Sequence, residues 1–195
     1  ILLDVMLPHK DGFDVCREVV NVLLDAYGSR MQPAPIWERL YTLKRYGQKA
    51  GAGFYLYGDR AGQQDPEFTH LLTELQTAAH SGPSGVVAGE RPREFSVARL
   101  VLPMINEAIR CLEEHVCTAA DVDLAVIAGL GFPQEKGGLL HYADQVGLAT
   151  VLKELEQLTA VYGERFWPSP LLKRKVAAGH LGCEAKQGFF EYTTR

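Results

Sequence analysis

Two kinds of side chain in this sequence could bind a polar or anionic ligand. Asn106 lies beside Glu107 in an apolar stretch that predicts a helix, and its amide could hydrogen-bond a substrate carbonyl or hydroxyl. The alternative is that this polar pair satisfies backbone groups of a neighbouring turn. Lys49 and Lys136 each lie near flexible glycine and could meet a phosphate, although a lysine is usually solvated.

The first residues raise a different chemistry. ILLDVMLPHKDGFDV resembles the phosphoacceptor segment of a response-regulator receiver domain, with Asp4 as the phosphoacceptor. Such a site also needs an acidic pair that holds magnesium and a lysine, usually followed by proline, and the sequence contains no Lys-Pro dipeptide. Two interpretations stay open: Asp4 ends or caps an apolar packing segment, or it accepts a phosphoryl group.

Other classes of chemistry lack their residue patterns. The six histidines have no metal-ligand spacing, so we expect no metal site, and the sequence has no GxSxG string, no supported Ser/His/Asp order and no P-loop. The four cysteines have no CxxC spacing, which indicates free thiols in a reducing, cytoplasmic compartment. A net charge of -4 argues against nucleic-acid binding. No apolar run reaches the ~18–20 residues of a membrane span.

A duplicated segment organises the elements that must position these residues. Tyr27–Tyr57 and Tyr162–Tyr192 align without a gap at one constant offset, since 162 − 27 = 135. The offset is far longer than a solenoid period, so it indicates a duplicated subdomain. The segments share identical residues at the positions of Tyr27, Gly28, Arg30, Pro33, Pro35, Arg39, Gly47, Ala50, Gly53, Phe54 and Tyr57.

Hydrophobic periodicity predicts helices on both sides of this segment. Asp14–Gly28 and Leu148–Gly163 are amphipathic counterparts, and a helix from Pro35 should stop near Gly47 with Lys44 and Arg45 in its last turn. Ser96 should cap a long helix, and Thr118 with Asp121 resembles a capping box. The apolar stripe of the long helix should contain Leu100, Val101, Met104, Ile105, Ala108, Ile109 and Leu112.

We therefore predict an all-α fold of two tandem related helical subdomains. Residues 1–11 form an atypical lead-in, 12–58 a truncated first copy, 59–94 a linker with one short helix from Glu67 to Ala79, and 95–195 the second copy. The aromatic residues Phe54, Tyr55 and Tyr57 should fold back into the core. Because the chain opens on Ile1 and not on Met, we expect it to be the tail of a longer protein.

Three motifs in this frame carry a family resemblance. GxGFY at Gly51–Tyr55, NEA at Asn106–Ala108 and GLGFP at Gly129–Pro133, with HYADQVG, are together similar to the duplicated C-terminal helical domain of L-3-hydroxyacyl-CoA dehydrogenases. That domain ends the multifunctional enzymes of fatty-acid β-oxidation, after a Rossmann domain that binds NAD. The resemblance runs from about Gly12 to Tyr192.

The resemblance implies a function. The chain should be the substrate-side and dimerisation part of an NAD-dependent 3-hydroxyacyl-CoA dehydrogenase, and inactive in hydride transfer alone, because the catalytic His–Glu pair and NAD belong to the Rossmann domain. Implied partners are that domain, acyl-CoA and either a second copy or a thiolase subunit. A helper asparagine belongs to the first copy, and Asn106 lies in the second. The open alternative is a non-catalytic helical module that binds other proteins.

Overall fold

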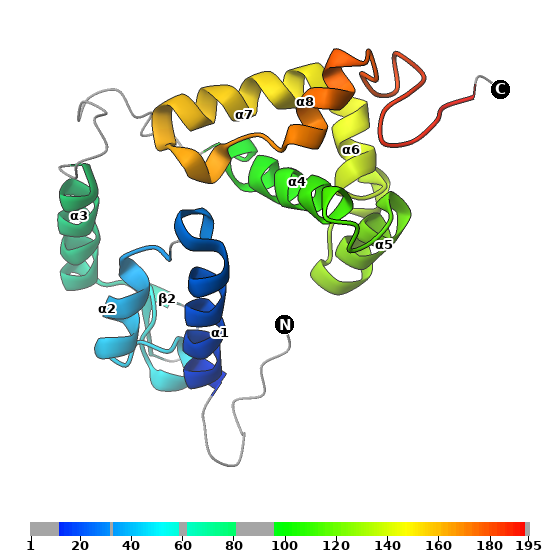
Figure 1. Ribbon diagram of the computed structural model, residues 1–195. Coiled ribbons are helices and arrows are strands. Elements are labelled where there is room, and N and C mark those ends of the chain that lie inside the picture. Colours follow the sequence, from blue (N-terminus) through cyan, green and yellow to red (C-terminus); the bar gives the residue numbers. More distant parts are fainter. Residues whose placement is uncertain (1–11, 32, 59–61, 81–95, 194–195) are drawn as a thin grey trace. The chain divides into compact units, whose positions relative to one another are not determined.

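The chain divides into two compact units, residues 1–90 and residues 91–195. The computed structural model describes residues 12–31, 33–58, 62–80 and 96–193 (Figure 1). Each unit is described here by itself. No helix among the described ranges is both long enough and apolar enough to cross a membrane.

Unit 1 consists of helices joined by short 3₁₀ turns and one hairpin. The strands β1 and β2 are antiparallel, with Tyr55 opposite Gln64 and Tyr57 opposite Gly62. They are short and mostly exposed, so the unit is helical in character. Its elements are α1 (Gly12–Tyr27), η1 (Gly28–Met31), α2 (Ile36–Thr42), η2 (Gln48–Ala50), β1 (Tyr55–Tyr57), β2 (Gly62–Gln64) and α3 (Pro66–His80).

Over the described residues 96–193, unit 2 contains five α-helices. The long helices α4 and α7 pack against each other, α6 and α8 pack against both of them, and α5 packs against α6 (Figure 1). Together with the helices of unit 1, this confirms the predicted all-α fold. The elements are α4 (Ala98–Glu113), α5 (Ala119–Leu130), η3 (Gln134–Lys136), α6 (Leu139–Val146), α7 (Leu148–Tyr162), η4 (Glu164–Phe166) and α8 (Pro170–Ala177).

The core of unit 2 forms where the apolar faces of these helices meet. Burying each aliphatic side chain contributes about 1.5–3 kcal/mol relative to leaving it exposed. The side chains with at most 1% exposure include Ile105, Ile109, Leu140, Leu148, Val151, Leu155 and Leu172.

Two details of α4 differ from the prediction. Leu100 is 57% exposed, and Leu102 is buried instead. Ser96 does not cap the helix, because the N-cap residue is Val97 and no side chain bonds the first turn there. The predicted capping box of α5 is confirmed: Thr118 accepts from the Asp121 amide, and the Asp121 carboxylate accepts from the Thr118 amide.

The duplication is visible in the local structure of each unit. α1 and α2 correspond to α7 and α8, and the glycine-rich loops that follow share their backbone hydrogen bonds. The Gly47 amide donates to the Ala52 carbonyl, as Gly182 does to Gln187. The Gly53 amide donates to Tyr55, as Gly188 does to Phe190. These pairs all carry the offset of 135 read from the sequence, since 182 − 47 = 135.

The helix predicted to run toward Gly47 is shorter than expected. α2 ends at Thr42, so Lys44 and Arg45 lie beyond it. Lys44 has φ = 52°, and the amides of Lys44 and Arg45 bond back to Tyr41 and Leu40. This is a Schellman turn, which ends a helix by placing one residue in the left-handed region.

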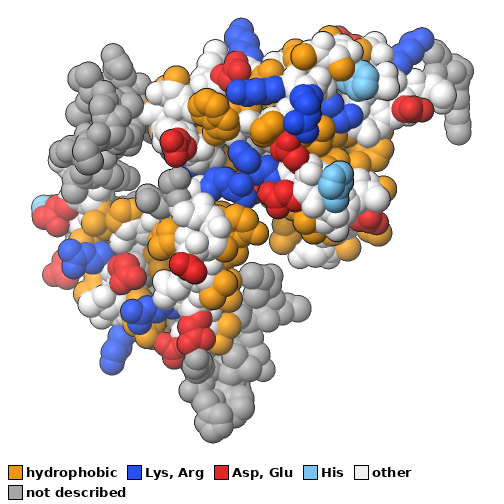
Figure 2. Space-filling view, in the orientation of Figure 1, with side chains coloured by type: hydrophobic (Ala, Val, Ile, Leu, Met, Phe, Trp, Pro, Cys, Tyr) orange, Lys and Arg blue, Asp and Glu red, His pale blue; other side chains and the backbone are white. Residues whose placement is uncertain are grey.

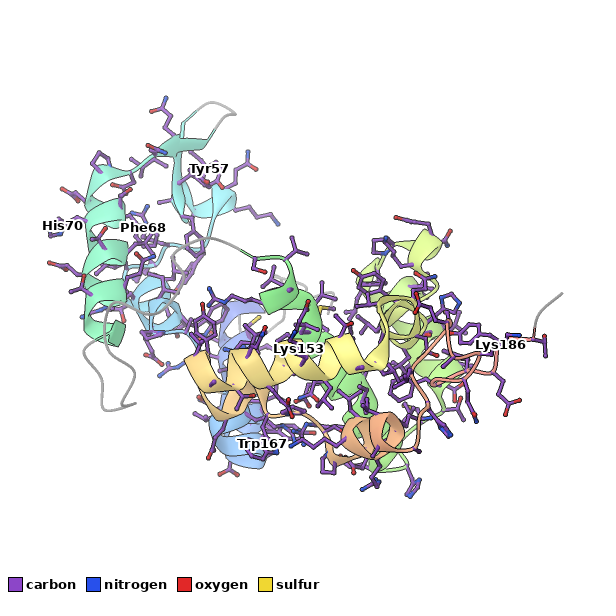
Figure 3. All side chains as sticks on the ribbon, turned by 90° about the horizontal axis from the view of Figure 1, so that it is seen from above. Tyr57, Phe68, His70, Lys153, Trp167 and Lys186 are labelled. Carbon is purple, nitrogen blue, oxygen red and sulfur yellow. The ribbon has the colours of Figure 1, made fainter. Side chains whose placement is uncertain are left out.

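The helix α3 belongs to unit 1, within the segment predicted as a linker. Asp65 accepts hydrogen bonds from the amides of Glu67 and Phe68, which caps α3. Arg45 pairs with Asp65 at 2.7 Å and lies over the Phe68 ring. In Figure 3, Phe68 lies on the inner side of α3, and His70 points away from it. The boundaries of the two copies stay a prediction.

The aromatic residues of the first loop do not enter the core as predicted. Phe54 and Tyr55 are about half exposed, at 52% and 49%, and only Tyr57 is partly buried. Phe54 instead packs edge-on against Phe68 at 5.6 Å between ring centroids. Its counterpart Phe189 does pack against the core of unit 2, so the two loops share a backbone but differ in the burial of their aromatic side chains.

Candidate functional site

Asn106, the residue expected to face a substrate, lies inside unit 2. It is 1% exposed, and both ends of its amide bond the turn before α8. Its Nδ2 donates to the Trp167 carbonyl at 2.9 Å, and its Oδ1 accepts from the Ser169 amide at 2.9 Å. The helix α4 therefore holds the Trp167–Ser169 turn through one asparagine. This geometry matches the structural alternative weighed for the polar pair in the sequence.

Side chains further along α4 complete the attachment of that turn. Arg110 also donates to the Trp167 carbonyl. Glu113 accepts from the Ser169 hydroxyl and from Arg174 of α8, each at 3.0 Å. Ser169 in turn caps α8 by accepting from the Leu171 amide. Three polar residues one turn apart on α4 thus fix the start of α8, and Pro168 and Ser169 are fully buried by this arrangement.

A second polar centre surrounds Asp144 of α6. This carboxylate is 1% exposed and accepts from the amides of Phe189 and Phe190 and from the Tyr192 hydroxyl. A side chain at Gly188 would overlap the carboxylate, so only glycine allows this close approach. Burial raises the pKa of Tyr192, and its hydrogen bonds to Cys183 and Asp144 add to that effect.

A third polar centre is the buried carboxylate of Asp123, which caps α6. Asp123 of α5 is 4% exposed and accepts from the amides of Leu140 and His141 at 2.8 and 3.0 Å. Burial raises the pKa of Asp123, and the hydrogen bonds from these two amides lower it by less. Gly138 has φ = 110°, and a Cβ there would strike Asp123. The carboxylate therefore joins α5 to the N-terminus of α6, where the helix dipole favours a negative charge.

The remaining predicted residues do not join these centres. Lys49 is exposed in η2 of unit 1, where it is accessible to a ligand. Asp4 lies outside the described residues. Lys136 lies in η3, with its amine 5.3 Å from the centre of the Tyr142 ring. The structure thus places Asn106 and Lys49 in different units.

A small hollow in unit 1 is lined by aromatic side chains. Its volume is only about 30 Å³, and it lies between Trp37, Leu40, Tyr41, Arg45 and Tyr46. The Tyr41 hydroxyl donates to Asp14 of α1 at 2.8 Å, and this bond raises the pKa of Tyr41. The corresponding positions of unit 2 carry no Phe, Tyr or Trp: Leu172, Lys175, Val176, His180 and Leu181.

These centres are suited to positioning elements. The carboxylates of Asp123 and Asp144 accept hydrogen bonds from backbone amides and one hydroxyl of other segments, so each joins two parts of unit 2. Within the described ranges, no group of three or more His, Cys, Asp or Glu side chains is placed to hold a metal ion. Sequence reasoning missed Asp123 and Asp144. A signal existed for Asp144, because it lies four residues after the apolar Leu140 and therefore on the same face of the predicted helix.

Comparison with known families matches the second unit. Residues 95–192 match the model of the 3-hydroxyacyl-CoA dehydrogenase C-terminal domain. The match covers all of α4 to α8 and includes Asn106, Asp123 and Asp144.

Individual relatives extend the similarity into unit 1. The alpha subunit of the fatty acid oxidation complex of Shewanella amazonensis is 37% identical over 86% of this chain, which is 23% of that protein. The Idiomarina loihiensis subunit of the same name is 34% identical over 90% of this chain and 24% of that protein. The chain thus spans about a quarter of the length of these curated relatives.

A solved structure shares the fold. The dehydrogenase part of multifunctional enzyme 1 from C. elegans matches with a TM-score of 0.51 and 23% identity. The match covers 81% of this chain and 36% of that chain.

Proposed function

Because the chain belongs to the family of 3-hydroxyacyl-CoA dehydrogenase C-terminal domains, we propose that it is the substrate-side and dimerisation part of such an enzyme. The reaction is the NAD-dependent oxidation of an L-3-hydroxyacyl-CoA in fatty-acid β-oxidation. The match of residues 95–192 to the family carries this proposal. The relatives named as subunits of the fatty acid oxidation complex support the pathway.

Hydride transfer in this proposal takes place on an NAD-binding Rossmann domain outside this chain. The matched family is itself a C-terminal domain, and the relatives are about four times longer than the chain. NAD supplies the hydride acceptor when it is bound by that domain. The chain's own residues keep α4 and α8 in register through Asn106. By itself, the chain does not oxidise a hydroxyacyl-CoA.

Two candidate site residues have different roles in this proposal. Asn106 is a positioning residue, because both ends of its amide are occupied by the Trp167–Ser169 turn. Lys49 is the candidate contact for a phosphate of coenzyme A, since its ammonium is exposed and an exposed ammonium can pair with a phosphate as a point charge.

The partners proposed are the Rossmann domain and either a second copy of this chain or a thiolase subunit. The relatives' description as subunits of a complex supports an assembly. Both units expose acidic, basic and apolar side chains in the view of Figure 2, and the net charge of the chain is -4. Free cysteines at positions 16, 111, 117 and 183 agree with a reducing compartment, so we place the protein in the cytoplasm.

Titration of the purified chain with acetoacetyl-CoA tests the acyl-CoA part of the proposal. Isothermal calorimetry should show saturable binding, and addition of NAD with 3-hydroxybutyryl-CoA should produce no NADH absorbance. Lys49→Ala should weaken binding about fivefold, because one charge-assisted contact is worth roughly 1 kcal/mol. Lys153→Ala is the matched control, since Lys153 is exposed on α7 (Figure 3).

Two results would contradict the proposal. NADH production by the chain alone would show that hydride transfer needs no other domain. Absence of acyl-CoA binding, together with association only with other proteins, would favour the alternative of a non-catalytic interaction module.

A further inference from the structure

Two cysteines meet at the junction between α4 and α5. Cys111 lies in the last turn of α4, and Cys117 directly precedes Thr118, the N-cap of α5. Between them the chain reverses through a Schellman turn, in which the Val116 amide bonds the Cys111 carbonyl at 2.9 Å. His115 occupies the left-handed position of this turn with φ = 58°. The turn brings Cys117 back toward the helix that carries Cys111.

The two thiols face the same environment. Both side chains are half-buried and pack against the core of unit 2. The two thiols also lie close enough to affect each other: burial raises the pKa of Cys111, and the neighbouring Cys117 raises it further. The other cysteines are placed differently. Cys16 is on α1 of unit 1, and the thiol of Cys183 lies beside the hydroxyl of Tyr192.

We propose that Cys111 and Cys117 are a reversible redox site that closes to a disulfide between the end of α4 and the start of α5. The oxidant is a small disulfide such as oxidised glutathione. One cysteine loses its proton to solvent, and its thiolate attacks a glutathione sulfur to form a mixed disulfide, which releases one glutathione thiolate. The second cysteine then loses its proton and displaces the other glutathione. Two cysteine thiols are oxidised, and one oxidised glutathione is reduced to two glutathione thiols.

The pairing should be favoured over reaction at the other cysteines. Once one thiol carries glutathione, the second is already adjacent, so ring closure has a high effective concentration. Because the thiolate is the attacking species, the oxidation should become faster as the pH rises. The disulfide would link two helix ends that each contribute to the same core, without changing which residues that core buries.

Mass spectrometry of the intact 195-residue chain tests the proposal. The chain is equilibrated with glutathione buffers of increasing oxidised fraction, quenched with acid, alkylated with N-ethylmaleimide in denaturant and digested with trypsin. Both cysteines fall in one tryptic peptide, 111–136, because no Lys or Arg lies between Arg110 and Lys136. We expect this peptide unalkylated and about 2 Da lighter than the dithiol, as one disulfide forms with loss of two hydrogens. The amount of this disulfide peptide should exceed that of the glutathione adduct about tenfold.

Single variants give the controls. Cys111→Ser and Cys117→Ser should each convert the remaining thiol of the pair to a stable glutathione adduct, whereas Cys183→Ser should leave the 111–136 disulfide unchanged. The wild-type readout needs no variant, so a folding defect of a serine variant does not affect it. A peptide 111–136 that carries two alkyl groups or two glutathiones at every oxidised fraction would overturn the proposal.

Discussion

At the scale of single residues, three buried polar side chains hold unit 2 in register. Asn106, Asp123 and Asp144 are each at most 4% exposed, and each bonds backbone groups of another element. A buried polar group that keeps its partners costs little, but removing one partner leaves the other unpaired in a site without water. The free energy of unfolding should therefore be sensitive to substitution at these positions.

Asn106→Ala should lower the free energy of unfolding of unit 2 by about 2–3 kcal/mol, because the Ser169 amide would be left buried without a partner. Urea denaturation followed by circular dichroism measures the change. Leu100→Ala on the same helix is the control, since Leu100 is 57% exposed, and it should change stability by less than about 0.5 kcal/mol. Equal effects of the two substitutions would show that Asn106 is not a structural contact.

Asp65 and Asp123 should respond to pH in opposite directions. Burial raises the pKa of Asp65, but hydrogen bonds from Phe68 and Arg45 outweigh it and leave that pKa below 3.8. Its stabilising effect is thus present above pH 3.8 and is lost as the pH falls through the lower folded pKa. Burial dominates at Asp123 and raises its pKa, so its contribution is largest below pH 3.8 and declines as the pH rises toward the folded pKa.

Urea unfolding of Asp65→Asn and Asp123→Asn between about pH 3 and pH 7 measures this difference. The stability advantage of the wild type over Asp65→Asn should grow with pH, and its advantage over Asp123→Asn should shrink. If the two differences in stability changed in the same direction with pH, the pKa of Asp65 and the pKa of Asp123 could not be shifted in opposite directions.

At the scale of elements, the duplication supplies its own matched comparison at the end of α2 and α8. Lys44 and Gly179 hold the same left-handed position in equivalent Schellman turns, with φ of 52° and 80°. A residue with a Cβ pays roughly 1–2 kcal/mol there, and glycine does not. The first copy therefore keeps a turn for which its sequence is less suited.

Lys44→Gly should stabilise unit 1 by about 1 kcal/mol, whereas Gly179→Lys should destabilise unit 2 by a similar amount. Thermal unfolding measured by circular dichroism compares the two substitutions with the wild type. Destabilisation by Lys44→Gly would mean that the lysine side chain contributes contacts that exceed the strain of its backbone.

The ends of the helices also show how much of the fold could be predicted from the sequence. Thr118 and Asp121 identified the start of α5 because capping depends on neighbours three residues apart. The early end of α2 at Thr42 had no such local signal, and the helix was predicted too long. Asp144 was missed for a different reason: its partners Phe189 and Phe190 are more than 40 residues away, and only the folded chain brings them together.

The candidate site, too, could be predicted only where the signal is local in the sequence. The family motifs located Asn106, Gly129–Pro133 and the glycine-rich loops, because these are contiguous strings. The sequence could not show whether Asn106 faces a ligand or a turn, since that depends on the Trp167–Ser169 segment about 60 residues later. The exposure of Phe54 and Tyr55 likewise could not be predicted, because the apolar character of a side chain does not by itself show that it is buried.

At the scale of the whole molecule, the chain consists of two compact units, 1–90 and 91–195. The ion pair of Arg45 with Asp65 and the edge contact of Phe54 with Phe68 lie entirely in the first. The hydrogen bonds of Asn106 and Asp144 lie entirely in the second. Contacts confined to one unit should affect the unfolding of that unit alone.

Differential scanning calorimetry of the full chain should therefore show two unfolding transitions. Asp65→Asn should lower the midpoint of one, and Asn106→Ala should lower the midpoint of the other. Each variant acts as the control for the other. A single transition that both substitutions shift would show that the two units unfold as one cooperative body.

The two glycine-rich loops have one further consequence. The carbonyl of Gly53 accepts from Arg45, and the equivalent carbonyl of Gly188 accepts from Lys175, which corresponds to Leu40 and not to Arg45. The two copies thus meet the same backbone requirement with cations from different positions. A crossover between the two gene segments at any point from Arg45 to Asp65 could place His180 where Asp65 needs an arginine, so selection should act against such an exchange.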